Sequence, residues 1–163
     1  METKSSVIAL SAVAVLAGVG IFLPFDGESI QKLTVTHGVV EASSTTGEGV
    51  GAVRSFLVDT VVNGVDAEGQ YMVGTLTTLT GAVEDSGEVR SSDLIFVMGS
   101  EADQLVVGGI SFYPQSGQTL ADGEDTVRPV IGGAGAYLGA VGQVTSTNLG
   151  ADGWSHVFEL VIP

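Results

Sequence analysis

The amino-acid sequence predicts an all-β protein: an eight-stranded antiparallel β-barrel that follows an apolar N-terminal segment. The chain of 163 residues holds 24 glycines and many valines and threonines, which are typical of strands and turns. From residue 32 onward, short stretches of alternating polarity are separated by acidic turns that contain glycine. A small barrel suits strands of this length, and a two-sheet sandwich is the alternative architecture.

The N-terminal segment, residues 1–28, is distinguished from the barrel domain, residues 29–163, by the uncharged run Ser5–Phe25. A run of this length can cross a bilayer as a helix. However, Glu2 offsets Lys4 in a weak signal region, no small-x-small cleavage site follows, and no aromatic belt flanks the run. These features favour a lid over the barrel mouth and a cytoplasmic protein. A membrane anchor or an export signal remains the alternative.

The first half of the barrel domain provides three strand candidates. Lys32–Val40 alternates in polarity and places His37 on its apolar face. The glycine- and serine-rich segment Glu41–Gly51 is predicted to be a loop. Ala52–Val62 and Tyr71–Leu79 follow as longer strands, joined by a turn of Asn, Asp and Gly residues.

The second half provides five more candidates, again bounded by turn residues. They are Ser92–Met98, Gln104–Tyr113, Val127–Ile131, Ala140–Asn148 and Trp154–Ile162. Glycines inside the strand patterns favour a barrel over a sandwich, because strongly coiled strands need them at corners. These glycines are Gly74, Gly108, Gly109 and Gly142.

Composition restricts the chemistry that the chain can perform. The absence of cysteine excludes disulfides and thiolate metal sites. A net charge of −14, with five scattered basic residues, disfavours nucleic acid and anionic lipid as partners. The acidic turns lack the spacing of a calcium loop, and neither His37 nor His156 has a carboxylate at ligand spacing. We therefore expect no metal and no cofactor.

Tyr113 and Gln115 are the candidate catalytic residues. They end the apolar strand Gln104–Tyr113 and lie two residues apart, so both are expected on the same side of the barrel mouth. A Tyr hydroxyl and a Gln amide there can orient a ligand through hydrogen bonds. A rim aromatic and an ordinary turn residue are the alternative interpretation.

Further residues complete the predicted site. Those expected to contact an apolar substrate are His37, Met98, Phe112 and Trp154, and those expected in the lid are Ile21, Phe22, Leu23 and Phe25. A core or rim position is the more common outcome for a histidine on an apolar strand face, so His37 is a less certain ligand contact. The strand Gln104–Tyr113 is apolar on both faces, which points to a homodimer through the barrel wall.

Two glycine motifs resemble those of the allene oxide cyclase, dirigent and spirotetronate cyclase barrels. Residues 65–75, VDAEGQYMVGT, resemble the D-x-x-G-x-x-V/I-G-T hairpin of that group. Residues 131–144, IGGAGAYLGAVGQV, resemble its GG-x-G signature. Together with the strand order, the resemblance extends from Lys32 to the C-terminus.

This resemblance implies a cofactor-free barrel that holds an apolar polyene or radical-derived substrate. The bacterial spirotetronate and spirotetramate cyclases are the most similar members, which implies an intramolecular (4+2) cycloaddition of a linear polyketide under an N-terminal lid. The polar residues of the plant cyclases have no matching set in this chain. A lipocalin-like carrier of an apolar ligand and a secreted or membrane-anchored dirigent-like protein are the alternative functions.

Overall fold

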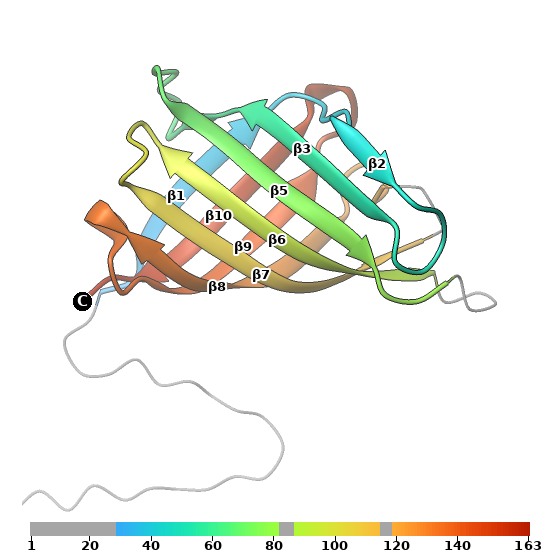
Figure 1. The fold of residues 1–163 in the computed structure, drawn as a ribbon. Coiled ribbons are helices and arrows are strands. Elements are labelled where there is room, and N and C mark those ends of the chain that lie inside the picture. The colour runs from blue at the N-terminus through green and yellow to red at the C-terminus, as the bar shows by residue number, and fades with distance from the viewer. Residues whose placement is uncertain (1–28, 82–86, 115–118) are drawn as a thin grey trace, which may run out of the picture.

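The computed structural model describes residues 29–81, 87–114 and 119–163 (Figure 1). Among these residues, eight strands have seven or more residues, and all strands join one antiparallel sheet that curls into a barrel-like shape. The predicted fold class is therefore confirmed. The strand bounds are β1 Gln31–His37, β2 Ser44–Thr46, β3 Val53–Asp59, β4 Val61–Val62, β5 Gln70–Thr78, β6 Glu88–Met98, β7 Gln104–Tyr113, β8 Asp125–Ala134, β9 Val141–Asn148 and β10 Trp154–Val161.

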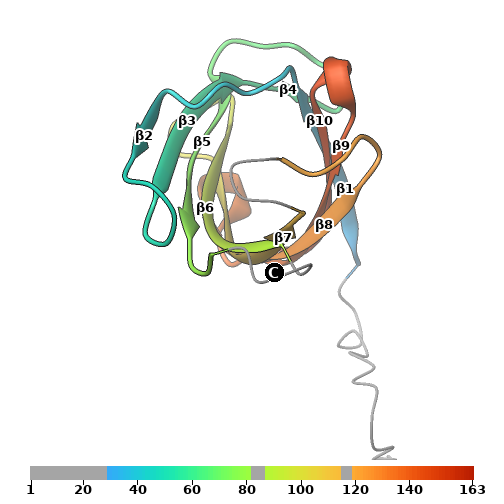
Figure 2. The same ribbon diagram turned by 90° about the vertical axis from the view of Figure 1, so that its right-hand side faces the viewer.

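The chain itself connects the two ends of the sheet, because β3 lies next to one edge strand and β4 is the other edge strand. The sheet order is β2-β3-β5-β6-β7-β8-β9-β10-β1-β4, and only Thr60 separates β3 from β4 in the chain. β3 pairs with β5, whereas β4 pairs with β1 and places Val62 opposite Val35. The amide of Asn63 extends this junction by donating to the carbonyl of Thr34 at 2.7 Å. Seen end-on, the strands form a ring (Figure 2).

Several elements differ from the sequence prediction. The predicted strand Ala52–Val62 is divided at Thr60 into β3 and β4, and β8 extends beyond the predicted Val127–Ile131 at both ends. β2 lies within Glu41–Gly51, which was predicted to be a loop, and all three of its residues are exposed. β6 begins at Glu88 rather than at the predicted Ser92. The first two inward-facing residues of β6, Glu88 and Arg90, are charged. The apolar alternation that marks a strand therefore begins only after them.

Inward-facing apolar side chains fill one end of the barrel lumen. Phe96 and Phe158 pack edge to face with 5.0 Å between ring centroids. Gly74 leaves room for Leu94, because a Cβ at that position would lie 2.6 Å from a Leu94 methyl carbon. Each such buried side chain contributes about 1.5–3 kcal/mol. The core consists of Leu33, Val35, Met72, Leu94, Phe96, Leu105, Val107, Val130, Ala140, Val144, Phe158 and Leu160.

Several predicted residues fall outside the described parts of the chain. These are Gln115 and the lid residues Ile21, Phe22, Leu23 and Phe25. Within the described parts, no helix is long and apolar enough to span a membrane.

Candidate functional site

The other end of the lumen holds a cavity of about 350 Å³ beside the end of β1 and the start of β10. Small-molecule pockets span roughly 300–1,000 Å³. One part of the wall is apolar and the other part is rich in cationic and hydrogen-bonding groups. The apolar side chains are Val40, Ala42, Phe56, Met72, Leu76 and Leu94, and the polar or aromatic ones are His37, Thr45, Arg54, Arg90, Tyr113, Thr119, Arg128, Ser146, Trp154 and His156.

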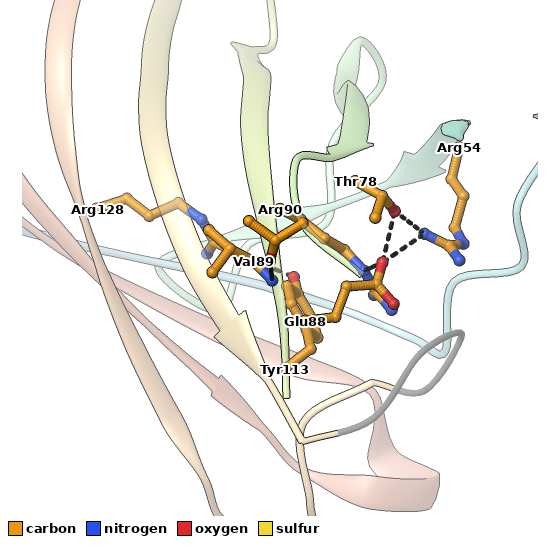
Figure 3. A network of polar contacts seen from close by, with 8 residues as sticks. Arg54, Thr78, Glu88, Val89, Arg90, Tyr113 and Arg128 are labelled. Carbon is orange, nitrogen blue, oxygen red and sulfur yellow. Dashed lines mark hydrogen bonds and ion pairs between the residues drawn. The ribbon is translucent and has the colours of Figure 1, made fainter. Parts of the chain in front are cut away.

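A buried carboxylate links two of the cavity's arginines (Figure 3). Glu88 is 1% exposed, and its Oε1 accepts a hydrogen bond from Arg90 Nε at 2.8 Å. Arg54 Nη1 lies 3.8 Å from the same oxygen, and the hydroxyl of Thr78 also donates to it. The pair forms because Glu88 and Arg90 are two residues apart on β6, where alternation points both side chains inward.

Arg128 lines another part of the cavity wall, and hydroxyl groups hold its guanidinium in place. Its Nε donates to Ser92 Oγ at 2.9 Å, and its Nη2 donates to Tyr113 Oη at 3.2 Å. The Tyr113 ring also packs under the guanidinium of Arg90, at 4.0 Å from the ring centroid, which is a cation–π contact. Burial lowers the pKa of Arg128, while the neighbouring Tyr113 opposes that shift. Tyr113 therefore connects two cationic side chains.

Two buried histidines form a hydrogen-bonded chain beside the arginines. His37 Nδ1 lies 2.7 Å from the Gly38 carbonyl, the Nε2 atoms of His37 and His156 are 2.9 Å apart, and His156 Nδ1 lies 2.8 Å from Ser146 Oγ. A carbonyl only accepts, so His37 carries its proton on Nδ1 and accepts from His156 Nε2–H when both rings are neutral. His156 Nδ1 then accepts from the hydroxyl of Ser146.

The environment of these histidines favours their neutral form. Burial lowers the pKa of His37, although its bond to Gly38 acts in the opposite direction. The pKa of His156 lies well below its usual range because of burial, with smaller contributions from His37 and Arg128. With both rings neutral, the hydrogen bonds run in one direction, from the Ser146 hydroxyl through His156 and His37 to the Gly38 carbonyl.

The structure places the predicted site residues in three settings. Tyr113, His37 and Trp154 line the cavity. Met98 is partly buried and packs against the apolar core instead. Phe112 is 65% exposed on the outer face of β7, because strand alternation sends it opposite to its buried neighbour Tyr113.

Sequence reasoning missed the three arginines and Glu88. Arg54, Arg90 and Arg128 come from β3, β6 and β8, and they are far apart in the sequence. A weak signal was present at Arg54 and Arg128, since each lies within a predicted strand at a position where alternation permits an inward direction. That all three side chains point into the same cavity can be seen only once the strands are assembled into the curled sheet.

No family model matches the chain, and no curated protein matches it. Solved structures share its fold. One, described as pyocyanin demethylase, aligns with a TM-score of 0.57 at 18% identity, covering 82% of this chain and 100% of the other. The pterocarpan synthase dirigent protein GePTS1 aligns with a TM-score of 0.60 at 14% identity, covering 92% of this chain and 98% of the other. At these identities the likeness establishes a dirigent-like barrel fold, in line with the resemblance seen in the sequence.

The cavity has the parts to bind and orient an organic molecule. Its apolar wall suits a hydrocarbon chain, and the guanidinium and hydroxyl groups suit oxygen acceptors at one end of such a chain. Among the residues that the structure describes, no group of three or more His, Asp or Glu side chains could hold a metal ion.

Proposed function

We propose that this protein is a cofactor-independent cyclase that folds a linear polyene in its lumen and promotes an intramolecular (4+2) cycloaddition to a spiro-tetramate or spiro-tetronate. The observation that carries this proposal is the divided cavity inside a dirigent-like barrel, apolar on one side and hydrogen-bonding on the other. A cycloaddition needs a folded chain and an activated carbonyl rather than an acid–base pair. Both requirements match the groups in the cavity wall.

The apolar wall supplies the positioning. Phe56, Met72 and Leu94 come from three successive strands of the sheet and present a continuous hydrocarbon surface to the cavity. Binding there would hold the diene and dienophile as a near-attack conformer. Such ordering can contribute up to about 7–11 kcal/mol of the barrier.

Tyr113 supplies the activation. Its oxygen accepts a hydrogen bond from Arg128, which leaves its own O–H free to donate to a substrate carbonyl. Two cationic side chains next to the phenol strengthen that donation. A single preorganised donor of this kind typically contributes 10²- to 10³-fold, or about 2.7–4 kcal/mol.

The test is to incubate the full-length protein with a linear diene that carries a tetramate or tetronate dienophile. We expect the cyclised product to form faster than in buffer and as one stereoisomer, measured by chiral chromatography. Tyr113→Phe keeps the ring beneath Arg90 and removes the hydroxyl, so kcat should fall by about 100-fold.

Tyr71→Phe is the matched control, because Tyr71 is a β5 residue that does not line the cavity, and it should leave the rate unchanged. Equal rates with and without the wild-type protein would overturn the proposal. Recovery of the bound precursor unchanged would instead indicate a carrier.

A second candidate is favoured by the match to a dirigent protein over 92% of the chain. In that case the cavity would orient phenoxy radicals that a separate oxidant makes, and the protein itself would carry no oxidant. The diagnostic experiment adds the protein to a phenol and a one-electron oxidase. An enantiomeric excess in the coupled product, together with no effect on the diene, would favour this candidate.

A further inference from the structure

The chain places all of its arginines inside the barrel. Its five basic residues comprise two lysines and three arginines, against nineteen acidic residues. Arg54, Arg90 and Arg128 all line the cavity, whereas Lys32 is exposed on the outer surface and pairs with Glu159. A chain with a net charge of −14 thus encloses a concentrated positive charge in its lumen.

Among the residues that the structure describes, the positive charge that lines the cavity exceeds the negative charge in contact with it. Among the described residues, Glu88 is the carboxylate in contact with this cluster, and it pairs with Arg90 and Arg54. Arg128 contacts the hydroxyls of Ser92 and Tyr113, which carry no formal charge. Burying a guanidinium without a counter-charge is unfavourable, because its hydration is lost and no opposite charge replaces it. An anionic ligand could therefore supply the counter-charge that Arg128 lacks in the described part of the chain.

A second observation points the same way. Arg90 is 3% exposed, and its Nη2 is a buried nitrogen without a hydrogen-bond partner in the described structure. Buried N–H groups in folded proteins nearly always have partners, because a buried donor without one has lost its hydrogen bonds to water without replacement. Arg90 lines the cavity, so its guanidinium borders the space that a ligand would occupy.

We propose that the cavity binds a small molecule whose apolar chain ends in an ionised oxygen acid, either a carboxylate or the acidic enol of a tetramate or tetronate. Arg128 and Arg90 hold the acid, with Tyr113 donating between them, while Phe56 and Leu94 contact the chain. This inference rests on the proposed function, and it specifies the substrate class. The guanidinium cluster in a low-dielectric lumen also gives an anion a local attraction that the acidic outer surface lacks.

The test compares the binding of each acid with that of its uncharged O-methyl derivative, called its ester below, by calorimetry on the full-length protein. The probes are 2,4-hexadienoate and its methyl ester, and a 3-dienoyl tetramic acid and its O-methyl enol ether. The members of each pair have nearly the same shape and differ in charge. We expect the acid to bind at least about tenfold tighter than its ester, and the tighter-binding acid of the two identifies the head group.

Variants localise the effect. Arg128→Gln should weaken binding of the acid by about 30-fold or more and leave binding of the ester unchanged, because the ester does not use the charge. Lys32→Gln removes the same charge on the outer surface and should leave both affinities unchanged. If Arg128→Gln fails to fold, the comparison of acid with ester on the wild-type protein still decides the question.

The outcomes separate this inference from the cyclase proposal. Tight binding of an acid without any turnover of the diene would support the anion site and overturn the cyclase. Equal affinity for acid and ester, or no binding of either acid, would overturn the anion site even if the diene is cyclised. An equal loss of acid affinity in Lys32→Gln and Arg128→Gln would also overturn it, since the effect would then come from net charge.

Discussion

His37 and His156 give the barrel a defined response to acid. Both have a pKa below the usual value of 6.5 in the folded protein, mainly because of burial, so the unfolded chain binds protons more readily than the folded one. Their contribution to stability is thus fully present above about pH 6.5 and is lost as the pH falls toward the folded pKa values. Each unit of pKa shift corresponds to about 1.4 kcal/mol.

We therefore expect the melting temperature to fall between pH 7.5 and pH 5.5. Among the described residues, the groups facing His156 are His37, Ser146, Phe96, Trp154 and Arg128, and none of these is a carboxylate that would favour its protonated form. Thermal melts of the wild type and of a His37→Gln, His156→Gln double variant measure the effect. The melting temperatures of the two proteins should differ most at pH 7.5, and this difference should be smaller at pH 5.5. A constant difference across this range would contradict the assignment.

At the scale of single strands, the agreement between sequence and structure depends on which side chains face inward. β7 has the predicted bounds, Gln104–Tyr113. Most of its inward-facing side chains are apolar or small, so the sequence pattern marks the whole strand. β6 was predicted four residues short because its inner face begins with Glu88 and Arg90. A buried ion pair and a solvated acidic turn have the same residue types in sequence, so local patterns cannot separate them.

The same limit explains the site. Tyr113, His37 and Trp154 could be identified locally, since each ends or begins a strand and alternation fixes its side. The arginine cluster could not, because Arg54 and Arg128 meet Glu88 and Tyr113 only through strand pairs that join distant parts of the chain. Composition gave net charge, but net charge carries no information about where the few cations lie.

The β9–β10 hairpin allows a test of backbone geometry. Gly153 has a φ of 91°, and a Cβ there would lie 2.1 Å from the backbone oxygen of His37 on the neighbouring strand. Gly64 has a comparable φ of 76° in open space. Gly64→Ala should cost about 1–2 kcal/mol from the positive φ alone.

Gly153→Ala should cost clearly more, because β1 must also move away from the hairpin, and this would displace His37 from its bond to His156. Chemical denaturation of the two variants measures the difference. Equal losses of stability would show that β1 can shift without cost, and the tight β1–β10 junction would then not fix the position of His37.

At the scale of the whole molecule, the closed sheet should fold without the N-terminal segment. Every strand of the described sheet lies within residues 31–161, and the chain at Thr60 connects β3, near one end of the sheet, to β4 at the other end. A variant lacking residues 1–28 should therefore melt within a few degrees of the full-length protein, since every strand pairing of the described sheet is kept. Circular dichroism at increasing temperature checks this expectation.

The same variant tests the role predicted for Ser5–Phe25, which lies outside the described residues. If the run covers the cavity during turnover, water will enter the truncated protein and weaken both the ordering of the chain and the bond between Tyr113 and the carbonyl. Cyclisation should then slow by at least about tenfold, which is only 1.4 kcal/mol of barrier. The acid should still bind, because the arginines that hold it come from β6 and β8. Unchanged turnover in the truncated protein would show that the run has no part in the reaction and serves as an anchor or export signal.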